Sequence, residues 1–363
     1  MRIIFVLPHI VVGGVDRVTL RLVSELQKRG HQCFFALRRS CGGLLNEAQK
    51  LCPVYELAKE GLHHFVPNLA KLINSLKATH IITAFADIGF LTYLSILCSR
   101  KKIIWIHGVH GAHNLITAKP TLIGHIRFKL DKFLSKIVYA KCKKIIAVSN
   151  GVKIDILEKF NCPENKVVTI YNPVLDPTQF ILKSQPEKKL NANIPIIVAM
   201  GRLTRVKGFD ILIKAMKIIP QPWMLYIWGE GEEKEHLQNL IKECKLEENI
   251  FLKGNTNQPF KVLREADIFV LSSRSEGLPT VLIEALCCQC KIVATNCPHG
   301  PAEILEDGLW GYLVENQNPK ALAKGIIEIM KKEPVSAELI FNRSQIFTVK
   351  TATDKWEDIL NEK

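Results

Sequence analysis

The 363-residue sequence has no uninterrupted apolar run long enough to cross a bilayer. Its most apolar stretch of that length, Ile81–Cys98, contains Asp87 and Gly89, so we interpret it as a strand, a loop and a helix. A secretory signal is also missing, because Met1–Leu7 is too short for the apolar core of such a signal and leads into a Pro-His-Ile loop. We therefore expect a cytoplasmic protein that begins with a strand.

A pattern of paired cysteines is missing as well. The 11 cysteines are odd in number and scattered, which is typical of free thiols in a reducing compartment. Cys287, Cys288 and Cys290, with Cys297 and His299 nearby, suggest zinc as an alternative. However, adjacent cysteines at the end of an apolar helix point in different directions, so we interpret them as small buried hydrophobic residues. There is no D-x-D motif to hold a divalent ion between phosphates, and we expect no metal.

Charge is plentiful but unevenly distributed. Residues 1–180 contain 25 Lys and Arg against 11 Asp and Glu, a net charge of +14, whereas residues 181–363 contain 24 of each kind. The two halves are therefore expected to meet different partners. A hydrophobic content of 47% supplies two cores, and we predict domains at residues 1–180 and 190–345.

Short apolar runs alternate with helical patterns in both halves, which predicts two doubly wound α/β domains with mostly parallel sheets. The strands expected in the first half are Ile3–Leu7, Gln32–Leu37, Ile81–Phe85, Ile103–Ile106, Lys144–Val148 and Val167–Tyr171. Those expected in the second half are Ile196–Met200, Trp223–Trp228, Ile250–Lys253, Asp267–Leu271 and Lys291–Ala294. The proline-containing stretch Asn172–Asn193 is interpreted as the connection, and Lys350–Lys363 as a final helix.

The stretch after the predicted strand Asp267–Leu271 has the composition of a ligand-binding turn. Glu276 lies on the loop, Thr280 is expected to be the N-cap of the next helix, and Glu284 lies one or two turns into that helix. A helix N-terminus attracts an anionic group such as phosphate, while carboxylates accept hydrogen bonds from sugar hydroxyls. Two solvated glutamates beside a turn are the plainer alternative.

Other turns with ligand-binding composition also follow predicted strands. Arg202 and Lys207 follow the strand Ile196–Met200, where cations suit a departing diphosphate. Gly13 and Gly14 follow the first strand, where glycines let the backbone approach a ligand closely. This first loop lacks G-x-G-x-x-G, which argues against dinucleotide binding.

These motifs resemble, in the same order along nearly the whole chain, those of the family-4 retaining glycosyltransferases. That family has the GT-B fold, in which two Rossmann-like domains face each other across a cleft. The stretch Ser275–Ala285 resembles the family's E-x7-E motif, and Gly201–Gly208 resembles its phosphate-binding pair. By this resemblance Glu276 would contact the donor hexose and Glu284 the ribose.

The resemblance also implies roles for residues outside these two motifs. Among residues matched to the family, Arg202 and Lys207 would bind the donor diphosphate, and His107 at a strand end would contact the donor sugar. Gly13, Gly14 and Asp16 would approach donor phosphate and acceptor, while His110 has no match. The remaining donor contacts implied are Gly231, Lys253, Gly277, Leu278 and Thr280.

The implied reaction is metal-independent transfer of a hexose from a nucleotide sugar, a UDP-sugar, with retention of configuration. Apart from this co-substrate, we expect no cofactor. Two alternatives remain at this stage. A GT-B-type sugar-nucleotide epimerase would need no acceptor, and a non-catalytic protein that binds membrane surfaces would need none of the site residues.

The acceptor is expected to contact the basic first half. The stretch Leu122–Cys142 can form a helix with Lys129, Lys132 and Lys136 beside an apolar face made of Ile126, Leu130, Phe133 and Ile137. Such a helix suits an anionic membrane surface or a phosphorylated glycolipid, although a core-packed helix with solvated lysines fits equally well. We expect a lipopolysaccharide or lipid-linked acceptor at the inner face of the cytoplasmic membrane. Nucleic acid is disfavoured, because exposed aromatics are not interleaved with the lysines.

Overall fold

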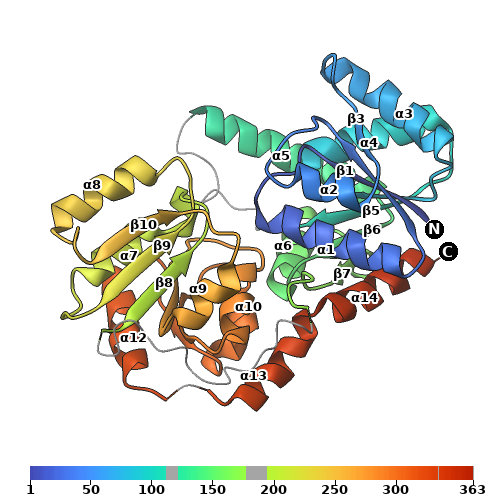
Figure 1. Cartoon of the computed structure of the whole chain (residues 1–363). Coiled ribbons are helices and arrows are strands. Elements are labelled where there is room, and N and C mark those ends of the chain that lie inside the picture. Colours follow the sequence, from blue (N-terminus) through green and yellow to red (C-terminus); the bar gives the residue numbers. More distant parts are fainter. Residues whose placement is uncertain (112–121, 177–193, 334, 363) are drawn as a thin grey trace. The chain divides into compact units, whose positions relative to one another are not determined.

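The chain forms two compact units, each built on its own sheet (Figure 1). The computed structural model describes residues 1–111, 122–176, 194–333 and 335–362. The first unit contains Met1–Pro173 and Val349–Lys363, and the second contains Val174–Thr348. All strand pairs within the two sheets are parallel, and the expected architecture of two doubly wound α/β domains is confirmed. Most of the connection expected from the sequence lies outside the described residues.

The first unit has a seven-stranded sheet in the order β3-β2-β1-β4-β5-β6-β7. Its strands are β1 (Arg2–Leu7), β2 (Gln32–Leu37), β3 (Val54–Glu56), β4 (His80–Thr83), β5 (Ile104–Val109), β6 (Lys144–Ala147) and β7 (Val167–Thr169). Its helices are α1 (Gly14–Lys28), α2 (Leu45–Leu51), α3 (Phe65–Ser75), α4 (Ala86–Ser99), α5 (Leu122–Lys141), α6 (Asn150–Phe160) and α14 (Val349–Asn361).

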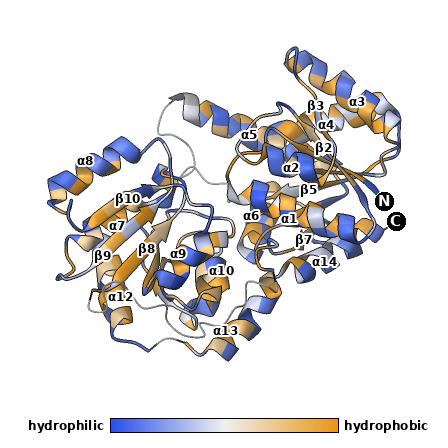
Figure 2. Cartoon of the chain, viewed as in Figure 1, coloured by the Kyte–Doolittle hydropathy of each residue, from blue (hydrophilic) through white to orange (hydrophobic). Residues whose placement is uncertain are grey.

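Helix α14 joins the first unit although it comes last in the chain. It packs beside α1, and its Trp356, Ile359 and Leu360 enter the core on that face of the sheet together with Phe5 and Leu26. Nearly every central strand residue is buried, because helices cover both faces of a parallel sheet. Figure 2 shows the corresponding pattern, with largely hydrophobic strands and helices striped with hydrophilic residues.

The second unit has a six-stranded sheet in the order β10-β9-β8-β11-β12-β13. Its strands are β8 (Ile196–Met200), β9 (Met224–Trp228), β10 (Ile250–Gly254), β11 (Ile268–Leu271), β12 (Lys291–Thr295) and β13 (Tyr312–Val314). Its helices are α7 (Phe209–Met216), α8 (Lys234–Cys244), α9 (Pro259–Glu265), α10 (Thr280–Cys287), α11 (Pro301–Leu305), α12 (Pro319–Met330) and α13 (Ala337–Ser344). Helices α7, α8 and α12 share one core with the sheet.

The strand order places one topological switch point in each sheet. In the first unit the chain moves from β1 to β2 and β3 on one side, and then returns to β4 on the other side of β1. The second unit repeats this step around β8, between β9 and β11. Loops diverge at such a point, so the carboxyl ends of the two central strands are the favoured ligand position in an open parallel sheet.

Within the described part of the chain, no helix is both long enough and apolar enough to span a bilayer.

Candidate functional site

The residues predicted to bind a donor in the second half come together at the carboxyl edge of the second sheet. Arg202 and Lys207 lie on the loop after β8, and Glu276 lies on the loop after β11, its neighbour in the sheet. Gly231 follows β9 and Lys253 lies at the end of β10, on the other side of β8. Glu276 therefore lies on one side of β8, and Gly231 and Lys253 lie on the other.

An ion pair lies at the centre of this edge. The Nζ of Lys207 is 2.6 Å from Oε1 of Glu276, and the same oxygen accepts a 2.6 Å hydrogen bond from the hydroxyl of Ser273. The side chains are only 23% exposed for Lys207 and 10% for Glu276, and Ser273 is fully buried. Charge-assisted bonds in such a setting are short and directional, so both charged groups are held in place before any ligand arrives.

The turn that carries Lys207 depends on a glycine. Gly208 ends the 3₁₀ turn Arg205–Lys207 with a φ of +65°, and a Cβ at this position would lie 2.1 Å from the carbonyl oxygen of Ser272. A side chain would therefore push the two loops apart. The aliphatic part of Lys207 lies against Gly201, 3.4 Å from where a Cβ would stand.

Arg202 differs from Lys207 in its surroundings. Its side chain is exposed, and it forms no hydrogen bond or ion pair among the residues that the structure describes. The adjacent Leu203 is buried, and its N–H donates to the carbonyl of Glu230 over 2.9 Å. A Cβ on Gly231 would lie 2.3 Å from the carbonyl oxygen of Leu203, so the loops after β8 and β9 pack backbone against backbone.

Lys253 is oriented by aromatic side chains rather than by an anion. Its Nζ lies 5.2 Å from the ring centre of Tyr226 and 5.8 Å from that of Phe251, within the range of cation–π attraction. The next residue, Gly254, accepts a 2.7 Å hydrogen bond from the N–H of Gly229. The end of β10 is thereby joined to the loop that carries Gly231.

Helix α10 begins one position earlier than predicted. Pro279 occupies the N-cap, so Thr280 is already the first helical residue and the prediction of a threonine cap is wrong. Pro279 has no side-chain oxygen, so the N-cap residue itself makes no capping hydrogen bond to the first turn of this helix. Leu278 and Glu284 are buried, and Glu284 lies on α10 as predicted.

The loop after β12 forms hydrogen bonds with the loop that carries Glu276. The N–H of Glu276 donates to the carbonyl of Pro298 over 2.7 Å, and the N–H of His299 donates to the carbonyl of Glu276 over 2.9 Å. A Cβ on Gly300 would lie 3.0 Å from the carbonyl oxygen of Gly277. The sequence motifs give no indication of these direct bonds to the backbone of Glu276.

In the first unit, His107 lies inside a strand rather than on a loop. Strand β5 continues to Val109, where the prediction ended it at Ile106, because the strand pairs with β6 as far as Val109. The His107 side chain is 2% exposed, and its Nδ1 is 2.7 Å from the hydroxyl oxygen of Thr83. Contact with a donor sugar stays a prediction for this residue.

The glycine pair lies at the switch point of the first sheet. Gly13 is the N-cap of α1 and Gly14 is its first residue, so this helix starts at the carboxyl end of β1. Asp16 is buried in the first turn, where a negative charge is favoured by the helix dipole.

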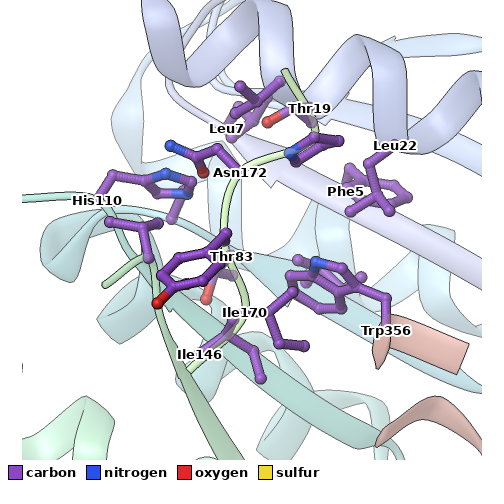
Figure 3. A pocket seen from close by; sticks show the side chains of 17 residues that line it. Phe5, Leu7, Thr19, Leu22, Thr83, His110, Ile146, Ile170, Asn172 and Trp356 are labelled. Carbon is purple, nitrogen blue, oxygen red and sulfur yellow. The ribbon is translucent and has the colours of Figure 1, made fainter. Parts of the chain in front are cut away.

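A small cavity lies beneath the same edge, lined from β1, β4, α1 and α14 (Figure 3). Its volume is about 40 Å³, room for a few water molecules at most. His110 and Asn172 lie at one end, and the buried Nδ1 of His110 has no hydrogen-bond partner among the described residues. Burial lowers the pKa of His110 to about 4, so the ring is neutral near pH 7.

The three predicted acceptor-side lysines are exposed on α5. Lys129, Lys132 and Lys136 face solvent, as expected. Ile126, Leu130 and Phe133 are also exposed, by 59%, 54% and 60%, so this part of the apolar face is not packed against the core. The last turns of α5 are anchored through buried residues such as Val138 and Tyr139.

The cysteine cluster has the character of core residues. Cys287, Cys288, Cys290 and Cys297 are all buried free thiols. Burial raises the pKa of Cys287 to about 11 and that of Cys297 to about 12, so these thiols are protonated near neutral pH. Among the described residues, no three His, Cys, Asp or Glu side chains are grouped closely enough to hold a metal ion.

Comparison with protein families gives one match for each half of the chain. The family model described as Glycosyltransferase Family 4 matches residues 12–175. The family model described as Glycosyl transferases group 1 matches residues 181–345.

Individual proteins agree with these matches. An uncharacterized glycosyltransferase of Haemophilus influenzae is 26% identical over 365 residues, covering 96% of each chain. The N-acetylgalactosamine-N,N'-diacetylbacillosaminyl-diphospho-undecaprenol 4-alpha-N-acetylgalactosaminyltransferase of Campylobacter jejuni is 32% identical over 204 residues, 56% of this chain and 55% of that protein. Among solved structures, Anabaena HepE in complex with UDP and glucose has a TM-score of 0.82 at 18% identity, covering 99% of each chain.

Proposed function

Because the chain belongs to the glycosyltransferase family that these two matches describe, we propose that it transfers a hexose from a UDP-sugar to a membrane-associated glycan acceptor. The proposal includes retention of configuration and independence of metal ions. One observation carries it: Lys207 and Glu276, a cation suited to phosphate and a carboxylate suited to hydroxyls, lie 2.6 Å apart at the switch point. A UDP-hexose carries the matching groups, a diphosphate and hydroxyls, on neighbouring carbon atoms of its sugar.

In the proposed reaction the bond between the anomeric carbon and the diphosphate oxygen breaks. Negative charge develops on the departing oxygen, so fixed positive groups stabilise the transition state more than the ground state. Lys207, Arg202 and the N-terminus of α10 would supply that charge. Removal of one such group is expected to lower the rate by about 10²- to 10³-fold.

The acceptor hydroxyl attacks from the same face that the diphosphate leaves. A new bond forms between the anomeric carbon and the acceptor oxygen, and the acceptor proton passes to the departing phosphate. Glu276 already accepts bonds from Lys207 and Ser273, which suits it to hold donor hydroxyls rather than to act as a nucleophile. The complex of Anabaena HepE with UDP and glucose supports the choice of donor.

The other predicted donor residues are assigned around this centre. Glu284 would hold the ribose, and Gly231 and Lys253 would border the nucleoside. Leu278 is buried behind the loop, where it would support Gly277 and Thr280 rather than contact the donor over a large area. In the first unit, Gly13, Gly14, Asp16 and His107 are assigned to donor phosphate, acceptor and donor sugar.

We assign the acceptor to a lipid-linked or lipopolysaccharide glycan, which would place the protein at the inner face of the cytoplasmic membrane. Exposed apolar residues beside Lys129, Lys132 and Lys136 on α5 suit an anionic bilayer surface, because both kinds of side chain gain from contact with it. The Campylobacter relative supports this assignment, since its name places the acceptor on diphospho-undecaprenol.

The test is a panel of UDP-hexoses and UDP-N-acetylhexosamines incubated with a bacterial membrane extract, with released UDP as the readout. We expect release with at least one donor only when extract is present, and a product with the donor's anomeric configuration by NMR. Lys207→Ala and Glu276→Ala should each lower transfer by at least about 10²-fold while circular dichroism stays unchanged.

Three results would contradict the proposal. Near-normal turnover by either variant would remove the site assignment. Epimerised nucleotide sugar in the absence of extract would indicate an isomerase. Membrane binding without any release of nucleotide, in the wild type and both variants, would indicate a non-catalytic protein.

A further inference from the structure

The turn that carries Lys207 is held by a neighbouring loop through all three of its carbonyl groups. The guanidinium of Arg274 donates to the carbonyl of Arg205 over 2.6 Å, and the N–H of Arg274 donates to that of Val206 over 2.7 Å. The hydroxyl of Ser272 donates to the carbonyl of Lys207 over 2.9 Å. Residues 272–274 therefore fix the position of the whole turn.

Two ion pairs cross between the same segments with opposite polarity. Lys207 pairs with Glu276, and three residues further along, Asp210 pairs with Arg274. Each segment thus carries one cation and one anion, so a shift of one segment along the other would separate both pairs or bring like charges together. The charge pattern specifies a single alignment of the two loops.

The Asp210–Arg274 pair has the geometry of a strong contact. Two parallel bonds of 2.8 and 2.7 Å join the guanidinium to the carboxylate, and the side chains are only 12% exposed for Arg274 and 20% for Asp210. Burial raises the pKa of Asp210, but the bonds and charge of Arg274 outweigh it, so the pKa lies below the usual value. Asp210 is accordingly ionised throughout the neutral range.

Ligand binding at the proposed site would change the Lys207–Glu276 ion pair and leave the Asp210–Arg274 ion pair intact. A diphosphate that binds Lys207 competes with Glu276 for the same ammonium group, so the Lys207–Glu276 bond is weakened or exchanged. Asp210 lies in the first turn of α7, and its carboxylate is already occupied by Arg274. The second pair therefore remains as the charged link between the loops.

We propose that Asp210 and Arg274 form a positioning pair, which keeps the Lys207 turn aligned with the Glu276 loop while Lys207 is engaged by a nucleoside diphosphate. The inference rests on the proposed function, because it assigns Lys207 to phosphate. The pair acts through Lys207 and needs no contact with the donor. A displacement of a catalytic group by about 1 Å can lower the rate by about 10²-fold, so a contact that fixes the position of Lys207 would have a large effect on the rate.

The test is a cycle of variants read by calorimetric titration with UDP, and with GDP and ADP where UDP does not bind. We expect Arg274→Gln and Asp210→Asn each to weaken nucleotide binding by about tenfold. In a Lys207→Met background the same substitutions should change affinity by less than about twofold, because the residue through which the pair acts is gone. Arg274→Lys keeps the charge without the bidentate geometry and should restore only part of the affinity.

Arg29→Gln is the matched control. Arg29 is another half-buried arginine held by carboxylates, those of Glu25, Asp354 and Glu357, but it lies in the first unit. Its loss should lower the melting temperature without changing nucleotide affinity per folded molecule.

The outcomes separate the inference from the function on which it rests. A wild-type protein that binds none of the three nucleotides contradicts the proposed function. A wild-type protein that binds one of them, with Arg274→Gln and Asp210→Asn variants that bind it equally well, overturns the positioning pair alone. Equal losses with and without Lys207 would also overturn it, since the pair would then be merely structural.

Discussion

At the scale of single residues, Lys207 is paired with an anion of its own chain where the proposed ligand would supply another. Glu276 takes the position of a counter-ion, and Ser273 holds its carboxylate toward the lysine. A diphosphate must therefore displace an existing contact and approach a negative carboxylate. A hydrogen bond from a sugar hydroxyl to the same carboxylate would offset this unfavourable free energy. The complete donor can form that bond and the free nucleotide cannot, so the site favours the complete donor.

This balance predicts opposite effects of Glu276→Gln on binding and on transfer. Free UDP should bind about tenfold more tightly, which corresponds to about 1.4 kcal/mol, because the competing charge is gone. Transfer should fall by about 10²-fold, because an amide holds the donor hydroxyls more weakly. Titration with UDP and assay of released UDP measure the two effects.

Glu328→Gln is the control for charge alone, since Glu328 pairs with the exposed Lys331 on the surface of the second unit. It should change neither quantity. Weaker binding of UDP by Glu276→Gln would mean that Glu276 does not compete with the ligand.

At the scale of elements, the long apolar strands and the helices between them could be predicted from the sequence, because their periodicity reports burial directly. Strands β3 and β13 were missed because each has only three residues and a glutamate, Glu56 or Glu315, interrupts the apolar run there. The equally short β7 lies in the longer apolar run Val167–Tyr171 and was predicted. The Lys207–Glu276 bond was also beyond the sequence, since it joins residues 69 positions apart and depends on which strands are neighbours. The motif order indicated a shared site, whereas the hydrogen bonds that hold it came only from the fold.

For helix α5, the amphipathic pattern predicted the position of the helix but not the surroundings of its apolar face. The pattern located the helix to within one residue but left open whether Ile126, Leu130 and Phe133 enter the core. Periodicity identifies an apolar face, not what covers it. The exposure of these residues removes core packing as the explanation for their hydrophobicity.

For α5 we predict salt-dependent binding to vesicles that contain phosphatidylglycerol. Substitution of Lys129, Lys132 or Lys136 by Gln should weaken binding by about fivefold each, from about 1 kcal/mol per lysine near an anionic surface. Phe133→Asp should weaken it further and at all salt concentrations. Sedimentation with vesicles at rising ionic strength measures both effects, and uncharged phosphatidylcholine vesicles are the control. Binding that is absent, or indifferent to salt, would rule out this surface.

Helix α14 provides a prediction about acid. Hydrogen bonds from Lys350 and Arg29 lower the pKa of Asp354, and those from His31 and Arg29 lower the pKa of Glu357. A lowered folded-state pKa stabilises the fold fully above the unfolded-state pKa, and this contribution is lost as the pH falls through the folded-state pKa, below about pH 4. Between pH 7 and pH 3 the melting temperature of the wild type should fall more than that of Asp354→Asn/Glu357→Gln. Parallel curves would show that these bonds do not anchor α14.

At the scale of the whole molecule, each unit has its own core. Trp356 belongs to the core of the first unit and Trp223 to that of the second. The site residues Lys207, Glu276, Asp210 and Arg274 all lie in the second unit. Damage to one core should therefore be separable from damage to the other.

We predict that Trp356→Ala destabilises the first unit by about 3–5 kcal/mol, because it leaves a cavity under α14. Hydrogen exchange should show lost protection in Met1–Pro173 and little change in Val174–Thr348. Trp223→Ala is the reciprocal control and should show the reverse pattern. Equal loss of protection in both units after either substitution would mean that they unfold together.

The membership of α14 in the first unit also has a consequence for synthesis. About 175 residues of the second unit are translated between Pro173 and Val349, so the last helix of the first unit leaves the ribosome after the second unit has been made. Until then the part of the sheet face that Trp356 covers lacks this helix in the nascent chain. Synthesis of the first unit thus begins before that of the second unit and ends after it. A chaperone that binds apolar surface would act on this face during that interval.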